Sequence, residues 1–173
     1  AEMHAPGKMV VHTSGSVNMD VLCDVTEYYG VLYPLQSLRS ESNRVSAIPL
    51  LVNAANHHTI DDLTSFALTL SPTVHFADEQ QRLNLHTAAV IVSNFTNYLY
   101  TLAKKFCEDE AADFSLLYPL IEEVAGRLHE SDPATMQTGP AVRGDISTIE
   151  KHLSLLSAYP ELKKIYQVLM VPG

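Results

Sequence analysis

Residues 138–145 read Thr-Gly-Pro-Ala-Val-Arg-Gly-Asp and hold a guanidinium and a carboxylate, Arg143 and Asp145, among turn-forming residues. His152 follows within an amphipathic segment. Arg143 can anchor an anionic ligand, or fix this loop against a partner subunit. The same residues also suit a plain helix entry, with Asp145 as N-cap and Arg143 paired with a surface acid. Thr138, Arg143 and Asp145 are therefore candidate substrate-binding or loop-anchoring residues.

A histidine and an asparagine, His86 and Asn94, lie eight residues apart in a strongly helical stretch. That interval is about two helical turns, so both side chains are expected on nearly the same face. Histidine can donate a proton to a carbonyl undergoing reduction, and asparagine can orient a carbonyl or an amide. We take them as candidate catalytic residues. The alternative is a packed helix with two satisfied polar groups.

The loop Thr-Ser-Gly-Ser at residues 13–16 follows a short β-branched run. In open α/β sheets, ligands bind at the carboxyl ends of strands. Hydroxyl and backbone N–H groups of such a loop can hold a phosphate, a carboxylate or a nicotinamide amide. Ser14 and Gly15 are therefore candidate cofactor-binding residues, although Ser-Gly loops are also common without any ligand.

Composition narrows the function classes. The chain has 173 residues, is 46% hydrophobic and carries a net charge of -9, so it can bury a core but lacks the basic surface that nucleic acid requires. The charge also argues against binding to an anionic membrane, and no apolar run is long enough to span one. No metal-ligand spacing occurs among the eight histidines. Cys23 and Cys107 are expected to be buried free thiols in a reducing cytoplasm.

The first half of the chain alternates short apolar runs with polar turns, which is typical of an α/β sheet. Strands are expected over residues 8–12, 31–38, 48–55 and 73–76. Pro49 indicates that its strand either lies at an edge of the sheet or begins at the proline.

Helices and a loop are expected between these strands. A short helix is predicted over residues 17–29, ended by Gly30. A longer one is predicted to run to about residue 70, with Thr59 as its N-cap. Residues 39–46 are polar and are expected to form a loop.

From residue 79 onward the pattern becomes entirely helical. One long helix is predicted over residues 79–106, followed by a second over 111–128 with Pro119 as a kink. After a loop over 129–144, helices are expected over 146–157 and from Pro160 to about residue 170. We therefore expect two domains, residues 1–78 and 79–173, of class α/β followed by all-α.

Several of these motifs together resemble a known protein family. The matching pieces are His12-Thr13-Ser14-Gly15-Ser16, Tyr33-Pro34-Leu35-Gln36-Ser37, His86-Thr87-Ala88-Ala89-Val90 with Ser93-Asn94, Tyr118-Pro119-Leu120, and Thr138-Gly139-Pro140 with Arg143-Gly144-Asp145 and His152. The chain resembles the uncharacterised family of NADP-dependent oxidoreductases in which a Rossmann-like domain precedes a helical domain of unknown function (domain of unknown function 2520). The resemblance covers nearly the whole chain and adds Gln36 to the candidate substrate-binding or loop-anchoring residues.

The resemblance implies an architecture like that of pyrroline-carboxylate reductase and the 6-phosphogluconate dehydrogenase-like group. The cofactor, NADP or NAD, would lie on the sheet, and the helical domain would close the substrate pocket and build a homodimer. Members of the family should begin with a strand, a G-x-G-x-x-G turn and a helix, which this sequence does not contain. We therefore expect residues 1–78 to be the C-terminal part of a Rossmann-like domain that does not hold a dinucleotide properly on its own. Tyr33 stands where the family often has histidine.

Two function classes follow. In the first, the protein is a cytoplasmic NAD(P)-dependent oxidoreductase that transfers hydride to or from a small polar substrate. In the second, it binds NADP and a ligand without turnover, as a sensor or scaffold. A helical assembly module without a ligand is a third option. Calorimetry with NADPH, paired with a turnover assay, separates the first two.

Overall fold

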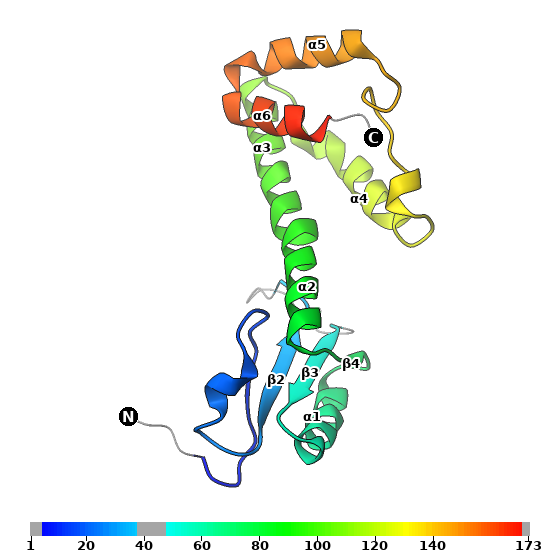
Figure 1. The fold of residues 1–173 in the computed structure, drawn as a ribbon. Coiled ribbons are helices and arrows are strands. Elements are labelled where there is room, and N and C mark those ends of the chain that lie inside the picture. The colour runs from blue at the N-terminus through cyan, green and yellow to red at the C-terminus, as the bar shows by residue number, and fades with distance from the viewer. Residues whose placement is uncertain (1–4, 38–47, 171–173) are drawn as a thin grey trace. The chain divides into compact units, whose positions relative to one another are not determined.

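The computed structural model of the protein describes residues 5–37 and 48–170 (Figure 1). The chain divides into two compact units, Ala1–Asn97 and Tyr98–Gly173. The polar loop expected over residues 39–46 lies outside the described residues. The expected domain boundary between residues 78 and 79 stays a prediction.

The first unit contains a four-stranded mixed sheet in the order β1-β2-β3-β4. Its strands are β1 (Val10–His12), β2 (Tyr29–Pro34), β3 (Leu50–Ala54) and β4 (Val74–Phe76). The pairs β1–β2 and β3–β4 are parallel, whereas β2–β3 is antiparallel. Pro49 comes just before β3, which is an internal strand, so the proline marks a strand start. An α/β region followed by an all-helical region is thus confirmed.

Side chains of β2 and β3 alternate between two apolar clusters, one on each face of the sheet. Leu32, Leu50 and Val52 pack with Leu63 and Ala67 of helix α1 (His57–Leu70). Val31, Tyr33 and Leu51 point to the opposite face and pack with Ala77. Because successive strand residues face opposite sides, both faces of these strands are buried and their sequences are almost continuously apolar.

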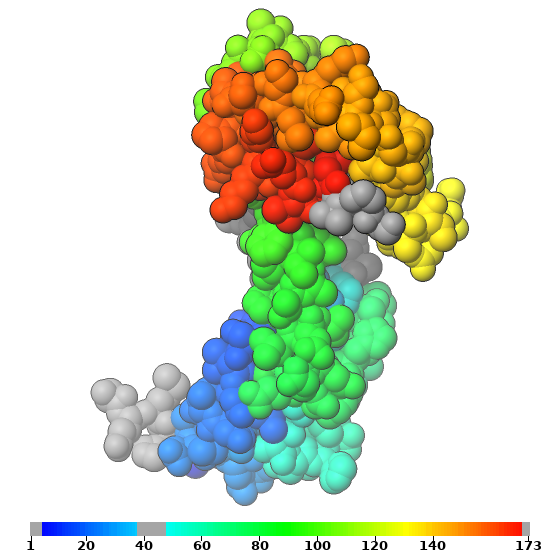
Figure 2. All heavy atoms as spheres, turned by 45° about the horizontal axis from the view of Figure 1, so that its top comes forward, coloured from blue at the N-terminus to red at the C-terminus, as the bar shows by residue number. Residues whose placement is uncertain are grey.

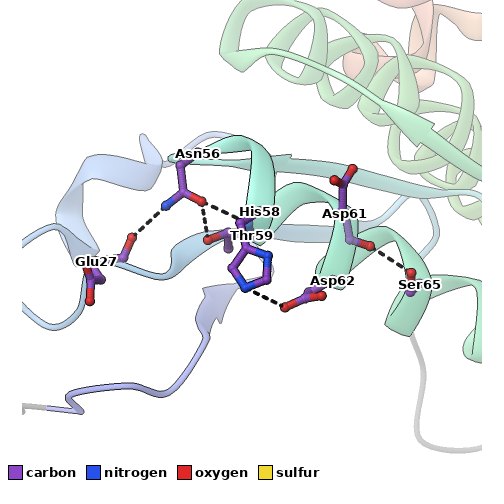
Figure 3. A network of polar contacts seen from close by, with 7 residues as sticks. All are labelled: Glu27, Asn56, His58, Thr59, Asp61, Asp62 and Ser65. Carbon is purple, nitrogen blue, oxygen red and sulfur yellow. Dashed lines mark hydrogen bonds and ion pairs between the residues drawn. The ribbon is translucent and has the colours of Figure 1, made fainter.

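Helix α1 begins three residues earlier than predicted. Its N-cap is Asn56, not Thr59, since the Asn56 side-chain oxygen accepts hydrogen bonds from the Thr59 N–H and the Thr59 hydroxyl, both at 2.9 Å (Figure 3). The Asn56 amide also donates to the carbonyl of Glu27 at 3.1 Å. One side chain therefore caps α1 and holds the turn that leads into β2.

The prediction of a helix over residues 17–29 is wrong. Only a 3-10 turn, η1 (Met19–Leu22), forms there, capped by the side chain of Asn18. Gly30 does not end a helix but lies inside β2. A Cβ atom at Gly30 would come within 2.4 Å of the Asn53 carbonyl oxygen. The glycine therefore serves the close approach of β2 to β3.

The long helix predicted over residues 79–106 is present but changes its geometry midway. It consists of α2 (Glu79–Ala89), a π-helix η2 (Val90–Phe95) and α3 (Thr96–Asp109). A capping box starts it, because the Asp78 carboxylate accepts from the Gln81 N–H at 2.8 Å and the Gln81 side chain accepts from the Asp78 N–H at 3.1 Å.

The second unit departs from the sequence prediction at Pro119. A 3-10 turn η3 (Phe114–Leu117) leads into α4 (Tyr118–Arg127), and Pro119 stands in the first turn of α4. The proline begins this helix instead of kinking a longer one, because a first-turn residue needs no intrahelical N–H bond. A further 3-10 turn, η4 (Pro133–Thr135), lies in the expected loop.

The last two helices are α5 (Ile146–Leu155) and α6 (Pro160–Leu169), joined by the 3-10 turn η5 (Leu156–Ala158). They lie side by side in both views, in orange and red (Figures 1 and 2). His152 Nδ1 and the Tyr166 hydroxyl link them at 2.7 Å. Asp145 and Pro160 occupy the helix-start positions predicted for them. Within residues 5–37 and 48–170, no helix has both the length and the apolar character needed to cross a membrane.

Candidate functional site

The loop after β1 is held in a compact turn by its own polar groups. The Ser14 hydroxyl oxygen accepts from the N–H groups of Ser16 and Val17, both at 3.3 Å. The Ser14 N–H donates to His12 Nδ1 at 3.2 Å. Gly15, which lies between the bonded residues Ser14 and Ser16, is buried. The loop therefore presents backbone, instead of a bulky side chain, at the carboxyl end of a parallel strand, where α/β sheets bind ligands.

His86 of α2 packs directly against this loop. A Cβ atom added to Gly15 would lie 2.6 Å from both Cγ and Nδ1 of the His86 ring. The same Nδ1 is 2.9 Å from the Tyr33 hydroxyl, and the two rings meet edge to face with centroids 5.8 Å apart. Burial raises the pKa of the Tyr33 hydroxyl, so it stays protonated at neutral pH. The loop and β2 thus converge on the imidazole that α2 carries.

Asn94 lies in the π-helix and is exposed. An α-helix completes two turns in about seven residues, so eight residues overshoot two turns. A π turn holds one residue more than an α turn. By these periods, eight residues that include a π segment come close to two full turns, which favours Asn94 on the same helix face as His86. Such π segments within α-helices occur often at functional sites.

A buried arginine, Arg82, lies one helical turn before His86. It is only 1% exposed, and its Nη2 donates to the Val17 carbonyl at 2.6 Å. Its Nε and Nη1 and the Nε2 of His12 are buried without a hydrogen-bond partner among the described residues. Burial, and then the positive charge of Arg82, lower the pKa of His12. His12 is therefore neutral at pH 7 and able to accept from Ser14.

The predicted residues of the second unit form a separate cluster. Asp145 caps α5, since its carboxylate accepts from the Thr148 N–H at 3.1 Å and from the Thr148 hydroxyl at 2.7 Å. These bonds with Thr148, and then the charges of Arg143 and His152, lower the pKa of Asp145. Gly139 and Gly144 have φ of 114° and 64°, which favour glycine. Thr138 and Arg143 are exposed.

The structure brings only some of the predicted residues together. Ser14, Gly15 and His86 lie at one place in the first unit. Gln36 is exposed, two residues after the end of β2. Thr138, Arg143 and Asp145 belong to the second unit. Cys23 is exposed and Cys107 half-buried, so the expectation that both thiols are buried is wrong.

Sequence reasoning missed three residues at this place. Arg82 was not considered, and only its spacing of three and four residues from Glu79 and His86 could have indicated it. In the sequence, His12 stands out only as part of a longer motif, and Tyr33 only as the residue at a position where the family often has histidine. A histidine or a tyrosine in a sequence does not show which distant residue its side chain will contact in the fold.

A hollow of about 590 Å³ is lined by other residues of α2 and by residues of β3 and β4. Apolar side chains line most of it, with His75, Gln81 and Asn84. Ser14, Gly15 and His86 do not line it, so it is distinct from the cluster above. Among the described residues, no group of three or more His, Cys, Asp or Glu side chains could hold a metal ion.

Residues 48–171 match the family described as Domain of unknown function (DUF2520). Among solved structures, the chain is similar to a "putative NADP oxidoreductase BF3122 from Bacteroides fragilis", with 38% sequence identity and a TM-score of 0.88 over 94% of this chain and 63% of that chain. It is also similar to protein TM1727 from Thermotoga maritima, with 20% identity and a TM-score of 0.73 over 92% of this chain and 65% of that chain. The second likeness concerns the fold alone. No curated protein matches the chain significantly. The chain spans less than two thirds of either solved structure.

Proposed function

The chain belongs to the DUF2520 family, and from this premise we propose that the protein is an NADP-dependent oxidoreductase that transfers hydride to or from a small polar substrate. The observation that carries the proposal is the packing of His86 against Gly15 and Tyr33 at the carboxyl end of β1. The similarity to a solved protein named as an NADP oxidoreductase supports the same chemistry.

The residues around Gly15 suit the nicotinamide end of the cofactor better than its pyrophosphate. Gly15 lacks a side chain, so the His86 ring packs directly on the loop backbone and lies beside whatever the loop binds. The sequence contains no G-x-G-x-x-G turn, which is the usual cradle of a dinucleotide pyrophosphate. The bound cofactor would supply the hydride chemistry, and Ser14 and Gly15 would orient its reactive ring.

His86 is the proposed proton donor, and its contact with Tyr33 leaves Nε2 for the substrate. To give up a proton the ring must be an imidazolium, whose Nδ1–H donates to the Tyr33 hydroxyl oxygen while Nε2–H stays available. His86 Nε2–H is then the group that faces the substrate carbonyl, while Asn94 orients that carbonyl through its amide. Gln36, Thr138, Arg143 and Asp145 stay candidates for anchoring the substrate or a loop.

Turnover of NADPH by the full-length protein, with a panel of keto acids and imines, tests this function. His86→Ala should lower kcat by about 100-fold or more, because a general acid typically contributes that much. Asn94→Ala should also lower turnover. The matched control is His129→Ala, which removes an exposed histidine of the second unit and should leave turnover unchanged. Unchanged turnover in both His86→Ala and Asn94→Ala contradicts the site.

A non-catalytic NADP sensor is the second candidate. It is favoured by the engagement of the Ser14 hydroxyl oxygen and of His86 Nδ1 in bonds within the protein. Calorimetry with NADPH distinguishes the two functions when it is paired with the turnover panel. Tight binding without oxidation of NADPH across the panel supports the sensor.

A further inference from the structure

Three side chains of helix α2 face the loop after β1. They are Glu79, Arg82 and His86, at spacings of three and four residues, which place them along one face of a helix. The loop residues that they contact, Asn18, Val17 and Gly15, follow in the reverse order along the chain. Helix and loop therefore meet at three successive points.

The first and third contacts lie at the two ends of this face. At one end, the Asn18 amide donates to the Glu79 carboxylate at 2.8 Å. At the other end, Gly15 lies so close to His86 that a Cβ atom would come within 2.6 Å of the ring. The loop is thus fixed to α2 by a hydrogen bond between exposed side chains and by close packing at a buried glycine.

The middle contact is costly and therefore informative. A buried guanidinium loses its hydration, and this penalty is large unless partners replace the water. Arg82 is 1% exposed, yet only its bond to the Val17 carbonyl, at 2.6 Å, replaces that hydration among the described residues. An apolar side chain would fill the same volume at less cost. A role in fixing the loop accounts for the arginine.

Arg82 also acts on the other end of the loop through His12. Burial lowers the pKa of His12, and the positive charge of Arg82 lowers it further because it disfavours a second cation nearby. Only a neutral imidazole has the free Nδ1 lone pair that accepts from the Ser14 N–H at 3.2 Å. Arg82 therefore supports the loop directly at Val17, and its charge adds to the burial that keeps His12 neutral beside Ser14.

We propose that Arg82 is a positioning residue, which holds residues 14–18 against α2 in the shape that receives the nicotinamide end of the cofactor. That the loop serves a cofactor rests on the proposed function. That Arg82 fixes the loop does not, because it follows from contacts within the protein alone.

Hydrogen exchange of the protein without cofactor tests the structural part. Arg82→Met keeps an apolar side chain in place and removes the charge and the bond to Val17. The amides of Ser14, Ser16 and Val17 should exchange about tenfold faster or more, as expected for losing a hydrogen bond to a charged group. Amides of Val31 and Val52 in the sheet should stay within about twofold. Unchanged exchange in the loop overturns the proposal.

A second variant keeps the test sharp if Arg82→Met does not fold. Glu79→Ala removes the exposed contact with Asn18 and should speed exchange in the same loop by a few-fold. Gln80→Ala is its matched control in the same helical turn, because the hydrogen bond of the Gln80 side chain among the described residues stays within α2, to Asn84 at 2.8 Å. Equal exchange of the loop in both variants contradicts the three-point contact.

The KM for NADPH, measured beside kcat, tests the cofactor part of the proposal. Arg82→Met should raise the KM for NADPH by about tenfold or more while kcat changes little, since the residue orders the binding loop and does not touch the reacting atoms. Arg82→Lys should restore part of the affinity, because its ammonium can still donate to the Val17 carbonyl. In the full-length protein, an unchanged KM, or a wild type that does not bind NADPH, overturns the cofactor role. A faster-exchanging loop in Arg82→Met then still upholds the positioning role.

Discussion

Gly15 shows how little room the candidate site leaves beside its imidazole. The loop backbone and the His86 ring are so close that no side chain fits between them. Tyr33 fixes the same ring from another strand. The orientation of His86 therefore depends on two neighbours that are distant in sequence, one of which contributes by having no side chain.

Gly15→Ala should lower the free energy of unfolding by about 1 to 3 kcal/mol, because overpacking at a filled position forces neighbours to shift. It should also displace the His86 ring from Tyr33. Urea unfolding measures the first effect, and the NMR signals of the His86 ring report the second.

The matched control for this change is Gly126→Ala. Gly126 lies in α4, and a Cβ atom there meets nothing within 4 Å. Alanine should stabilise that helix by a few tenths to about 1 kcal/mol. Equal effects of the two substitutions would contradict a special close contact at Gly15.

At the scale of elements, the N-terminal caps of α1 and α2 fix how these helices lie against neighbouring segments of the first unit. The capping box at Asp78 fixes where α2 begins, and hence which of its residues face the loop after β1. Asn56 caps α1 and reaches across to the carbonyl of Glu27, ahead of β2 (Figure 3). A cap that also joins two segments should matter more than a cap on an isolated helix.

Asn56→Ala should therefore cost about 1 to 2 kcal/mol of unfolding free energy, at the upper end of what a lost N-cap costs. Asn56→Ser keeps a capping oxygen but loses the bond to Glu27, so its cost should be smaller. Urea unfolding of both variants measures the difference. Full stability of Asn56→Ala would refute the double role of this side chain.

At the scale of the whole molecule, the second unit exposes many large apolar side chains. Each of the following is more than half exposed: Leu116, Tyr118, Leu120, Val124, Leu128, Ile146, Leu155, Val168 and Leu169. Apolar surface of this extent often marks a protein interface, and two-fold dimers are the commonest homo-oligomers. We propose that residues 79–173 build a homodimer.

Light scattering on the full-length protein at micromolar concentration should give the mass of two chains. Leu120 and Val124 lie four residues apart on α4, so the double change Leu120→Glu and Val124→Glu should shift the mass toward one chain. Glu122→Gln, on the same helix, should leave the mass unchanged. A monomer mass for the wild type would rule out the dimer and would favour helices that cover their apolar faces within one chain.

The sequence by itself determined the succession of elements, because helices and strands have different periods of apolar residues. The strands around Val10, Val31, Val52 and Val74 and the start of α5 at Asp145 followed from that pattern and from local capping chemistry. The resemblance of the motifs to an oxidoreductase family likewise needed no structure, and the match to DUF2520 confirms that family.

Only the tertiary structure decided which of these residues meet. Gly30 reads as a helix end, yet it lies in β2 because the approach of Asn53 excludes a side chain. The contacts of His86 with Gly15 and Tyr33 join residues more than fifty positions apart, and no local pattern encodes such a distance. Arg82 reads as an ordinary helical cation because its burial depends on the loop that folds over it. Periodicity and capping are local properties, whereas burial and close approach arise only when distant segments pack together.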